Sequence, residues 1–102
     1  MVHPSVQIHM PQLVALLKKH KVKNAFVFGS VLSKSFTAES DVDFLVNLED
    51  GLDPVIAGGH LWDLGYELED LLHRKIDLLT ERSLKNPYFI KELNETKFSI
   101  YG

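Results

Sequence analysis

The alternation of apolar and polar residues along positions 42–48 predicts a β-strand. Side chains alternate along a strand, so this segment presents one fully apolar face, made of Val42, Phe44, Val46 and Leu48. Residues 24–28 form a short apolar and aromatic run that ends at Gly29, which is typical of a buried strand stopped by a turn. Residues 75–79 predict a third strand, and the tail 98–101 predicts a last short strand or an edge segment.

Apolar residues at helical spacing predict further elements. The first helix begins at Pro11 and ends on a run of basic residues at 18–21, which suits a helix C-terminus. The main core helix covers residues 61–73 and buries a stripe of leucines, namely Leu61, Leu64, Leu68, Leu71 and Leu72. A final helical stretch begins within residues 80–83, is interrupted near Pro87 and continues through Ile90 and Leu93.

The segments between these elements predict turns. Residues 49–59 are rich in Gly, Asp and Pro, a composition that favours a loop across the domain. Ser30 follows Gly29 and is placed to N-cap a short helix. The order of strands and helices predicts an α+β fold, with a small sheet flanked by helices in one domain over residues 1–102.

Length and composition exclude several classes of protein. A chain of 102 residues can bury one hydrophobic core without covalent cross-links. The absence of cysteine excludes disulfides and thiolate metal sites. The apolar run at 13–17 stops at Lys18, short of the ~20 residues that a membrane span needs. We therefore expect a cytoplasmic protein with no membrane partner.

The charge balance also limits the partners. The chain has 14 acidic and 11 basic residues, which gives a formal net charge of -3. Proteins that bind a nucleic-acid backbone without sequence specificity need clustered cationic side chains. We therefore expect no direct binding to a nucleic-acid backbone. A bound polyanion would need metal ions to mask the negative charge.

Gly29 and Ser30 form the first candidate for chemistry. Glycine lets the backbone approach a ligand closely, and the free N–H groups at a helix start, with the Ser30 hydroxyl, favour an anion such as phosphate. A Gly-Ser pair after a strand is most often a turn and a cap. This pair alone therefore does not identify a phosphate site.

Asp41 and Asp43 form the second candidate. The period of a strand puts both carboxylates on one face, about 6.6 Å apart along the chain, so divalent ions can sit between and beside them. Turn chemistry alone would not explain Asp43, which is followed by the apolar residues Phe44, Leu45 and Val46. Like charges side by side raise each other's pKa and destabilise the fold unless a cation compensates them, which favours a metal site.

Asp77 is the third candidate, a lone carboxylate in an apolar strand. It should face a charge partner, a metal or solvent, because an unpaired buried charge is costly. If its strand lies beside the 42–48 strand, Asp77 joins the same cluster. The alternative is a structural ion pair with Arg74, Lys75 or Arg82.

These pieces together resemble the nucleotidyltransferase superfamily typified by DNA polymerase beta. The resemblance rests on Gly29-Ser30, ten intervening residues, Asp41-Val42-Asp43 and a later strand that carries Asp77. Length and the closing run from Lys75 to Tyr101 are most similar to the minimal MNT-type branch, the antitoxin partners of HEPN toxins. The resemblance implies a nucleotidyltransferase fold, with a small mixed sheet flanked by helices.

The resemblance also implies a reaction and its residues. It implies transfer of AMP from ATP to a hydroxyl, with a tyrosine of a partner HEPN toxin as acceptor and two Mg²⁺ ions as cofactors. By position, Asp41, Asp43 and Asp77 would be the catalytic and metal-binding residues, and Asp77 would help to deprotonate the acceptor. Gly29, Ser30 and Lys34 would hold the triphosphate. The resemblance leaves open whether the chain forms a homodimer or a hetero-oligomer.

One departure from the family pattern keeps two alternatives open. Family members commonly have Arg-Gly a few residues after the Gly-Ser pair, where this chain has Ser33-Lys34, and a lysine lacks the bidentate fork of arginine. The first alternative is therefore an antitoxin with weak or lost catalysis that neutralises its partner by binding. The second is a small-molecule nucleotidyltransferase, which usually needs a second domain for its acceptor.

The remaining aromatic residues and histidines favour structural interpretations. His3, His9, His20, His60 and His73 show no metal-ligand spacing, so we expect surface positions and no zinc site. Trp62 and Tyr66 lie four apart on the predicted core helix, where ordinary packing is favoured over stacking on an adenine or forming a partner surface. The cluster at 88–90 is expected in the core or at a dimer interface.

Overall fold

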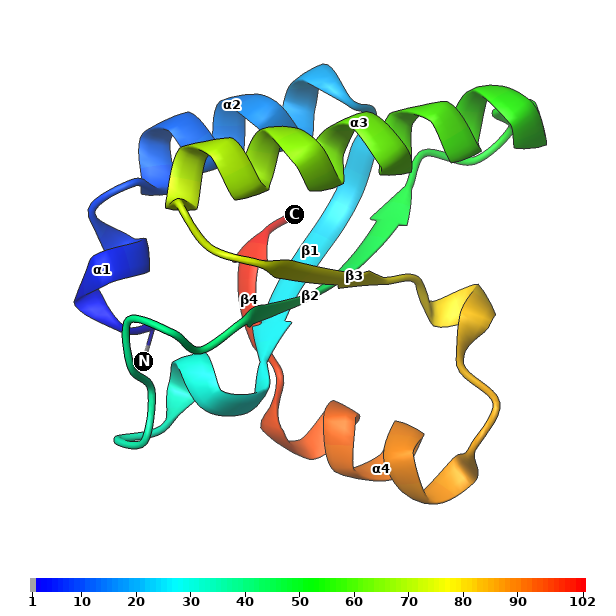
Figure 1. Ribbon diagram of the computed structural model, residues 1–102. Coiled ribbons are helices and arrows are strands. Elements are labelled where there is room, and N and C mark those ends of the chain that lie inside the picture. Colours follow the sequence, from blue (N-terminus) through cyan, green and yellow to red (C-terminus); the bar gives the residue numbers. More distant parts are fainter. Residues whose placement is uncertain (1) are drawn as a thin grey trace.

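A four-stranded mixed sheet lies at the centre of the computed structural model, which describes residues 2–102 (Figure 1). The strand order is β3-β2-β1-β4, with bounds β1 Val22–Phe28, β2 Val42–Leu48, β3 Ile76–Leu79 and β4 Phe98–Tyr101. β1 pairs antiparallel with both β2 and β4, whereas β2 and β3 run parallel. The predicted tail strand is confirmed as the sheet edge beside β1.

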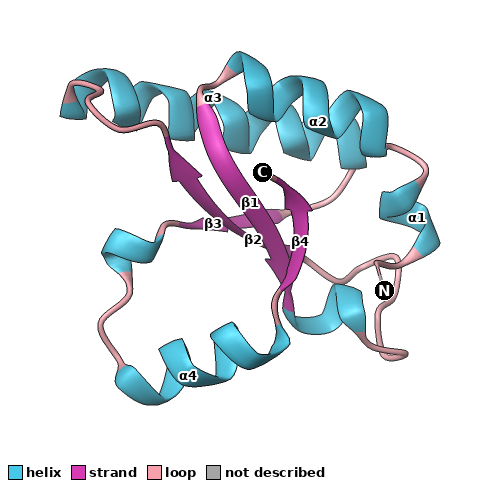
Figure 2. Ribbon diagram, turned by 180° about the vertical axis from the view of Figure 1, so that it is seen from behind, coloured by secondary structure: helices cyan, strands magenta, loops and turns pink. Residues whose placement is uncertain are grey.

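Helices lie on both sides of this sheet. α2 (Met10–Lys19) and α3 (Pro54–Leu72) pack together on one face, and α4 (Pro87–Thr96) lies on the other side (Figure 2). Shorter elements are the helix α1 (Pro4–Gln7) and the 3₁₀ turns η1 (Gly29–Leu32) and η2 (Glu81–Ser83). No helix within residues 2–102 is both long enough and apolar enough to cross a membrane.

The main core lies between the sheet and the α2–α3 layer. Val42, Phe44 and Val46 are fully buried there, which confirms the predicted apolar face of the 42–48 strand. They share one cluster with leucines from both helices, including Leu13, Leu17, Leu64 and Leu68. The alternating residues of β2 therefore point to the opposite face, toward α4.

The predicted loop over 49–59 is wrong in its second half, because α3 already begins at Pro54. The Asp53 side chain accepts a hydrogen bond of 2.9 Å from the Val55 backbone N–H, and proline suits the first helical position. Gly58, Gly59 and Gly65 then lie inside the helix, each with open space where a side chain would stand. The Asp53 cap, together with the burial of Leu64 and Leu68 in the core, thus offsets the low helix propensity of glycine.

Two local expectations also need correction. Ser30 does not N-cap the turn after β1, because the cap position is Phe28 and Ser30 lies inside η1. His20 is buried at 4% exposure rather than on the surface. Its Nε2 lies 2.7 Å from Glu67 Oε2 and its Nδ1 lies 3.1 Å from His60 Nδ1, so α2 and α3 are joined by a polar contact that satisfies the buried ring.

Candidate active site

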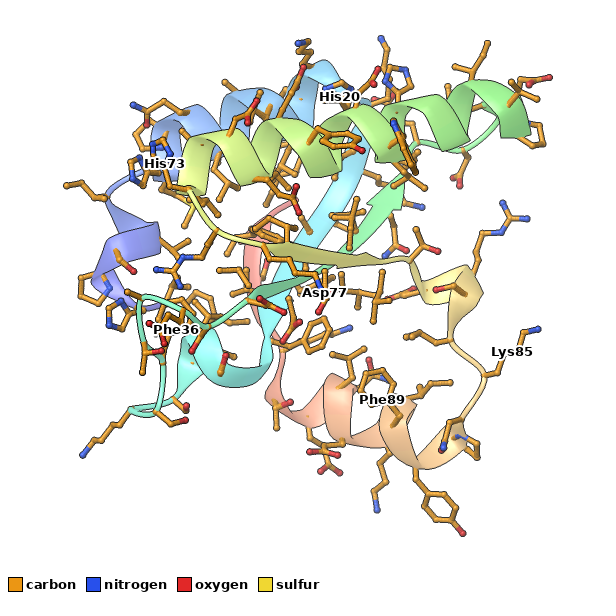
Figure 3. The ribbon with its side chains drawn as sticks, in the orientation of Figure 1. His20, Phe36, His73, Asp77, Lys85 and Phe89 are labelled. Atoms are coloured by element: carbon orange, nitrogen blue, oxygen red, sulfur yellow. The ribbon has the colours of Figure 1, made fainter. Side chains whose placement is uncertain are left out.

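Asp43 and Asp77 lie opposite each other on neighbouring strands. The parallel pairing of β2 and β3 aligns Asp43 with Asp77, and the two carboxyl groups are close enough to share a hydrogen bond. This confirms that the third strand lies beside the second. Leu78 faces α3, so Asp77 lies on the side of the sheet that α4 covers (Figure 3).

The surroundings of Asp43 raise its pKa from the ordinary value of 3.8 to about 6. Burial of the carboxyl group is the largest cause, followed by the charge and hydrogen bond of Asp77 and then by the charge of Asp41. An isolated structural carboxylate would not gather two further acids around it. The cluster therefore concentrates negative charge at one point, as cation-binding and catalytic sites do.

Gly29 makes room for the Asp43 carboxylate. Its φ is +76°, a conformation that other residues rarely adopt, and it stands where β1 ends and η1 begins. A Cβ at this position would lie 2.5 Å from Asp43 Oδ2. The resemblance assigns Gly29 to phosphate binding. The structure gives it a second role, because only a residue without a side chain leaves space for the Asp43 carboxylate at the end of β1.

The other residues predicted for the site are Asp41, Ser30 and Lys34. Asp41 immediately precedes β2, is half-buried and acts on Asp43 through its charge. Ser30 is half-buried in η1, and its carbonyl accepts hydrogen bonds from the backbone N–H and the hydroxyl of Ser33. Lys34 is exposed in the loop after η1.

The donor set fits Mg²⁺ in its chemistry, because carboxylate oxygens are the ligands that hard cations prefer. Asp43 and Asp77 are directly paired and Asp41 lies next to them, so the residues present match the ion class that the sequence predicts. Within residues 2–102, the side chains of His, Asp and Glu do not form a ready cluster of three metal ligands. The three aspartates are therefore neighbours rather than a closed coordination cage.

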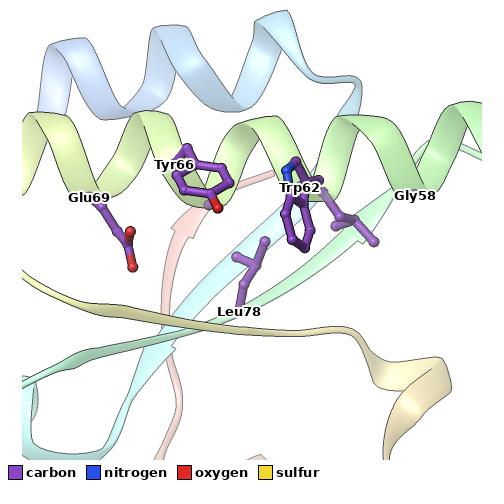
Figure 4. A pocket seen from close by; sticks show the side chains of 7 residues that line it. Gly58, Trp62, Tyr66, Glu69 and Leu78 are labelled. Carbon is purple, nitrogen blue, oxygen red and sulfur yellow. The ribbon is translucent and has the colours of Figure 1, made fainter.

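A cavity of about 410 Å³ lies on the opposite side of the sheet, between α3 and Leu78 (Figure 4). Trp62 and Tyr66 line it with their rings 5.4 Å apart, and they are 67% and 56% exposed. The expectation that these rings pack in the core is therefore wrong. Since this cavity and Asp43 lie on opposite faces of the sheet, the two rings do not belong to the acidic site.

The acidic site opens into a cavity of about 610 Å³ between the sheet and α4. It is lined from the sheet side by Phe28, Gly29, Leu32, Ser33 and Asp43, and from α4 by Phe89, Glu92, Leu93 and Thr96. The rings of Phe28 and Phe89 meet edge to face, 6.2 Å apart. The α4 residues are not among the site residues predicted from the sequence, although their spacing of three, four and seven from position 89 marks one helix face.

Comparison with known protein families shows which family this chain belongs to. The nucleotidyltransferase domain matches residues 11–98, which include the Gly-Ser turn, all three aspartates and α4. The chain belongs to the nucleotidyltransferase family. Two proteins of Methanocaldococcus jannaschii, whose names propose protein adenylyltransferases, are each 36% identical to this nucleotidyltransferase over 80 residues. Each alignment covers 78% of this chain and 78% of the relative, so the prediction of a nucleotidyltransferase enzyme is confirmed for the family.

Solved structures confirm the fold of this nucleotidyltransferase. One described as a proposed minimal nucleotidyltransferase is 26% identical, with a TM-score of 0.73, and the match covers 96% of this chain and 95% of that one. A toxin–antitoxin complex with AMP-PNP gives a TM-score of 0.70 at 23% identity, covering 91% and 73%. A tri-AMPylated HEPN toxin of Shewanella oneidensis with its MNT antitoxin gives 0.64 at 21%, covering 94% and 71%. The predicted minimal nucleotidyltransferase fold is thus confirmed.

Proposed function

We propose that this nucleotidyltransferase transfers AMP from ATP to a tyrosine hydroxyl of a HEPN-domain partner protein and thereby acts as an antitoxin. The observation that carries the proposal is the pairing of Asp43 with Asp77 beside Gly29, at a cavity large enough for a nucleotide. The relatives named as protein adenylyltransferases support transfer to a protein. The structural neighbour that contains a tri-AMPylated HEPN toxin supports the acceptor.

Each part of the cavity has a role in this proposal. The backbone at Gly29 and Ser30 holds the β- and γ-phosphates, because free N–H groups at a helical turn bind anions. Lys34 lies in the exposed loop after η1, outside the lining of the cavity, and adds only the point charge of its side-chain end to the phosphates. Asp41, Asp43 and Asp77 hold two Mg²⁺ ions. When bound, these ions supply positive charge to the phosphate oxygens of the transition state. Phe28 and Phe89 are the aromatic residues of the cavity lining and are placed to contact the adenosine.

The chemical step is an in-line displacement. The acceptor hydroxyl oxygen forms a bond to the α-phosphorus of ATP, and the bond from that phosphorus to the bridging oxygen breaks, which releases pyrophosphate. Asp77, which is exposed at the open side of the acidic cluster, accepts the proton of the attacking hydroxyl. An exposed base suits an acceptor that arrives on the surface of another protein.

The test uses ATP labelled in the α-phosphate, Mg²⁺ and a HEPN-domain protein from the same organism as this chain. We expect label on a tyrosine of the HEPN protein, its loss in Asp43→Asn and Asp77→Asn, and unchanged labelling in Asp70→Asn, which alters an exposed acid on α3. Labelling that persists in both aspartate variants would contradict the assignment of the site. Absence of label with wild-type protein and every nucleoside triphosphate would contradict the activity.

A second function, neutralisation of the toxin by binding alone, is favoured by one observation. Ser33 and Lys34 stand where family members commonly have Arg and Gly, and Lys34 is exposed and does not line the cavity. Weak triphosphate binding would leave a folded protein that still covers its partner. In that case, the double variant Asp41→Ala/Asp43→Ala would neutralise the toxin as well as wild type, whereas the proposed enzyme would lose neutralisation.

A further inference from the structure

Arg74 connects two parts of the chain that meet at the acidic cluster. It lies in the short link between α3 and β3, directly after His73, whose φ of +53° ends the helix and turns the chain (Figure 3). From this link its Nη1 donates to the Ser40 carbonyl at 2.8 Å and to the Thr37 carbonyl at 3.0 Å. Arg74 therefore does not pair with Asp77, the structural alternative that the sequence leaves open, but holds the loop before Asp41.

The loop that Arg74 holds is a small closed turn. The Ser40 N–H donates to the Thr37 carbonyl at 3.1 Å, and the Thr37 N–H donates to Ser40 Oγ at 3.0 Å. The Arg74 guanidinium joins the two carbonyls of the same turn. Residues 37–40 are exposed or half-buried, so these hydrogen bonds and the guanidinium fix the conformation of the turn where core packing does not.

Packing fixes the guanidinium itself. Its Cζ lies 4.4 Å from the centre of the Phe36 ring, and Phe36 is only 6% exposed. The ring of His3 packs on Phe36 at 4.8 Å. A planar cation with a ring beneath it and two carbonyls at its edge has little rotational freedom, so it fixes the turn more firmly than a flexible ammonium group could.

Asp41 follows this turn directly. The next residue, Val42, donates its N–H to the Lys75 carbonyl at 3.1 Å, so the chain on either side of Asp41 is held by residues 74 and 75. The same two residues lead into β3, which carries Asp77 opposite Asp43. One short link thus fixes the backbone that presents all three aspartates.

We propose that Arg74 is a positioning residue that holds the 37–40 turn so that the Asp41 carboxylate faces Asp43 and Asp77 and completes the divalent-cation site. This inference rests on the proposed function, since it takes the three aspartates as the cation ligands. Arg74 acts through the backbone of Thr37 and Ser40, so its loss weakens cation binding although it contributes no ligand.

The experiment measures binding of Mn²⁺ alone, by the electron paramagnetic resonance signal of the free ion, at a temperature well below unfolding. We expect Arg74→Met, which keeps the side-chain stem and removes the donors, to raise the Kd for Mn²⁺ about tenfold. Arg74→Lys should have a smaller effect. The matched control is Lys85→Met, which removes an exposed cation between η2 and α4 and should leave the Kd unchanged.

A double-mutant cycle separates positioning from general stability. If Arg74 acts through Asp41, Arg74→Met weakens Mn²⁺ binding much less in the Asp41→Asn background than in wild type. Equal effects in the two backgrounds, or equal Kd values for Arg74→Met and Lys85→Met, would overturn the positioning role. If Arg74→Met does not fold, Arg74→Lys enters the cycle in its place.

The failure of this inference is distinguishable from the failure of the proposed site. Weaker Mn²⁺ binding in Asp41→Asn and Asp43→Asn, with no effect of Arg74→Lys or Arg74→Met, removes only the positioning role. Unchanged binding in the aspartate variants would remove the cation site itself, and the role of Arg74 with it.

Discussion

Asp43 on β2 stands in register with Asp77 on β3, so two carboxyl groups from separate parts of the chain share one end of the sheet. Antiparallel neighbours or a shift of one residue would have put Asp77 on another face or beside another residue. Burial and the nearby charges of Asp77 and Asp41 disfavour the ionised form of Asp43 and so raise its pKa.

Asp43→Asn should stabilise the cation-free protein at neutral pH. The pKa of Asp43 rises from 3.8 to about 6 in the fold, so the stability contributed by this group is full below about pH 4 and is lost as the pH rises through about 6. Asparagine does not ionise, so the Asp43→Asn variant does not lose this stability as the pH rises. Because Asp43 is only half-buried, solvent screening limits the gain to about 1 kcal/mol, or about 4–8 °C in Tm.

The measurement is thermal unfolding of wild type and Asp43→Asn between pH 4 and pH 8 in the presence of a chelator. The two Tm curves should lie closest at pH 4 and separate as the pH rises through 6. A separation that stays constant with pH would contradict the assigned pKa.

Mg²⁺ should stabilise wild type by neutralising the same cluster. A ligand that binds only the folded state raises Tm with its concentration, so calorimetry in rising MgCl₂ should show an increase that NaCl at equal ionic strength does not reproduce. The increase should be absent in Asp43→Asn/Asp77→Asn. A rise of equal size in that double variant would place the bound Mg²⁺ elsewhere on the protein.

Gly29→Ala should reduce both stability and activity. The new Cβ would lie 2.5 Å from Asp43 Oδ2, on a backbone with φ of +76° that alanine resists, so we expect a loss of about 1–3 kcal/mol. The matched control is Gly59→Ala, which enters open space inside α3 and should gain about 0.5–1 kcal/mol. Denaturant unfolding measures both changes, and an equal effect of the two substitutions would contradict the close approach at Gly29.

Phe89→Ala should raise the KM for ATP and leave the fold intact. Phe89 lines the cavity beside Asp43 and meets Phe28 edge to face, so its removal takes away apolar contact area from the adenosine. We expect a rise of about tenfold, since one base–aromatic contact is worth about 1–3 kcal/mol. The neighbouring Tyr88→Ala, which alters a ring that is 85% exposed, should leave KM unchanged. An equal KM in the two variants would remove α4 from the nucleotide site.

Glu67→Gln should loosen the contact between α2 and α3. Hydrogen bonds from Lys19 and then His20 lower the pKa of Glu67, so its stabilising contribution is present above its ordinary pKa of 4.5 and is lost as the pH falls through the lowered value. The variant should therefore have a lower Tm than wild type at pH 7, and this difference should shrink below pH 4.5. Asp63→Asn, on the exposed side of the same helix, is the control, and a difference that grows on acidification would contradict the prediction.

Local patterns predicted most elements because their causes lie within a few residues. The alternation from Val42 to Val46 and the leucine spacing of α3 match the buried residues of the structure. The start of α3 was missed because the cap at Asp53 competes with several glycines, and composition alone does not weigh one against the other. The burial of His20 was missed because its partners, Glu67 and His60, lie some 40 residues further along the chain.

In the candidate site, too, some features follow from the local sequence and others from the tertiary structure. Residue types and short spacings are local properties, so they were enough to predict the candidate donors Asp41, Asp43 and Asp77, the glycine at the turn, and the family. Only the tertiary structure decided that Asp77 stands against Asp43, that α4 closes the cavity with Phe89, and that Arg74 holds the turn before Asp41. Strand register and contacts across the sheet depend on the packing of the whole core, which no short segment contains.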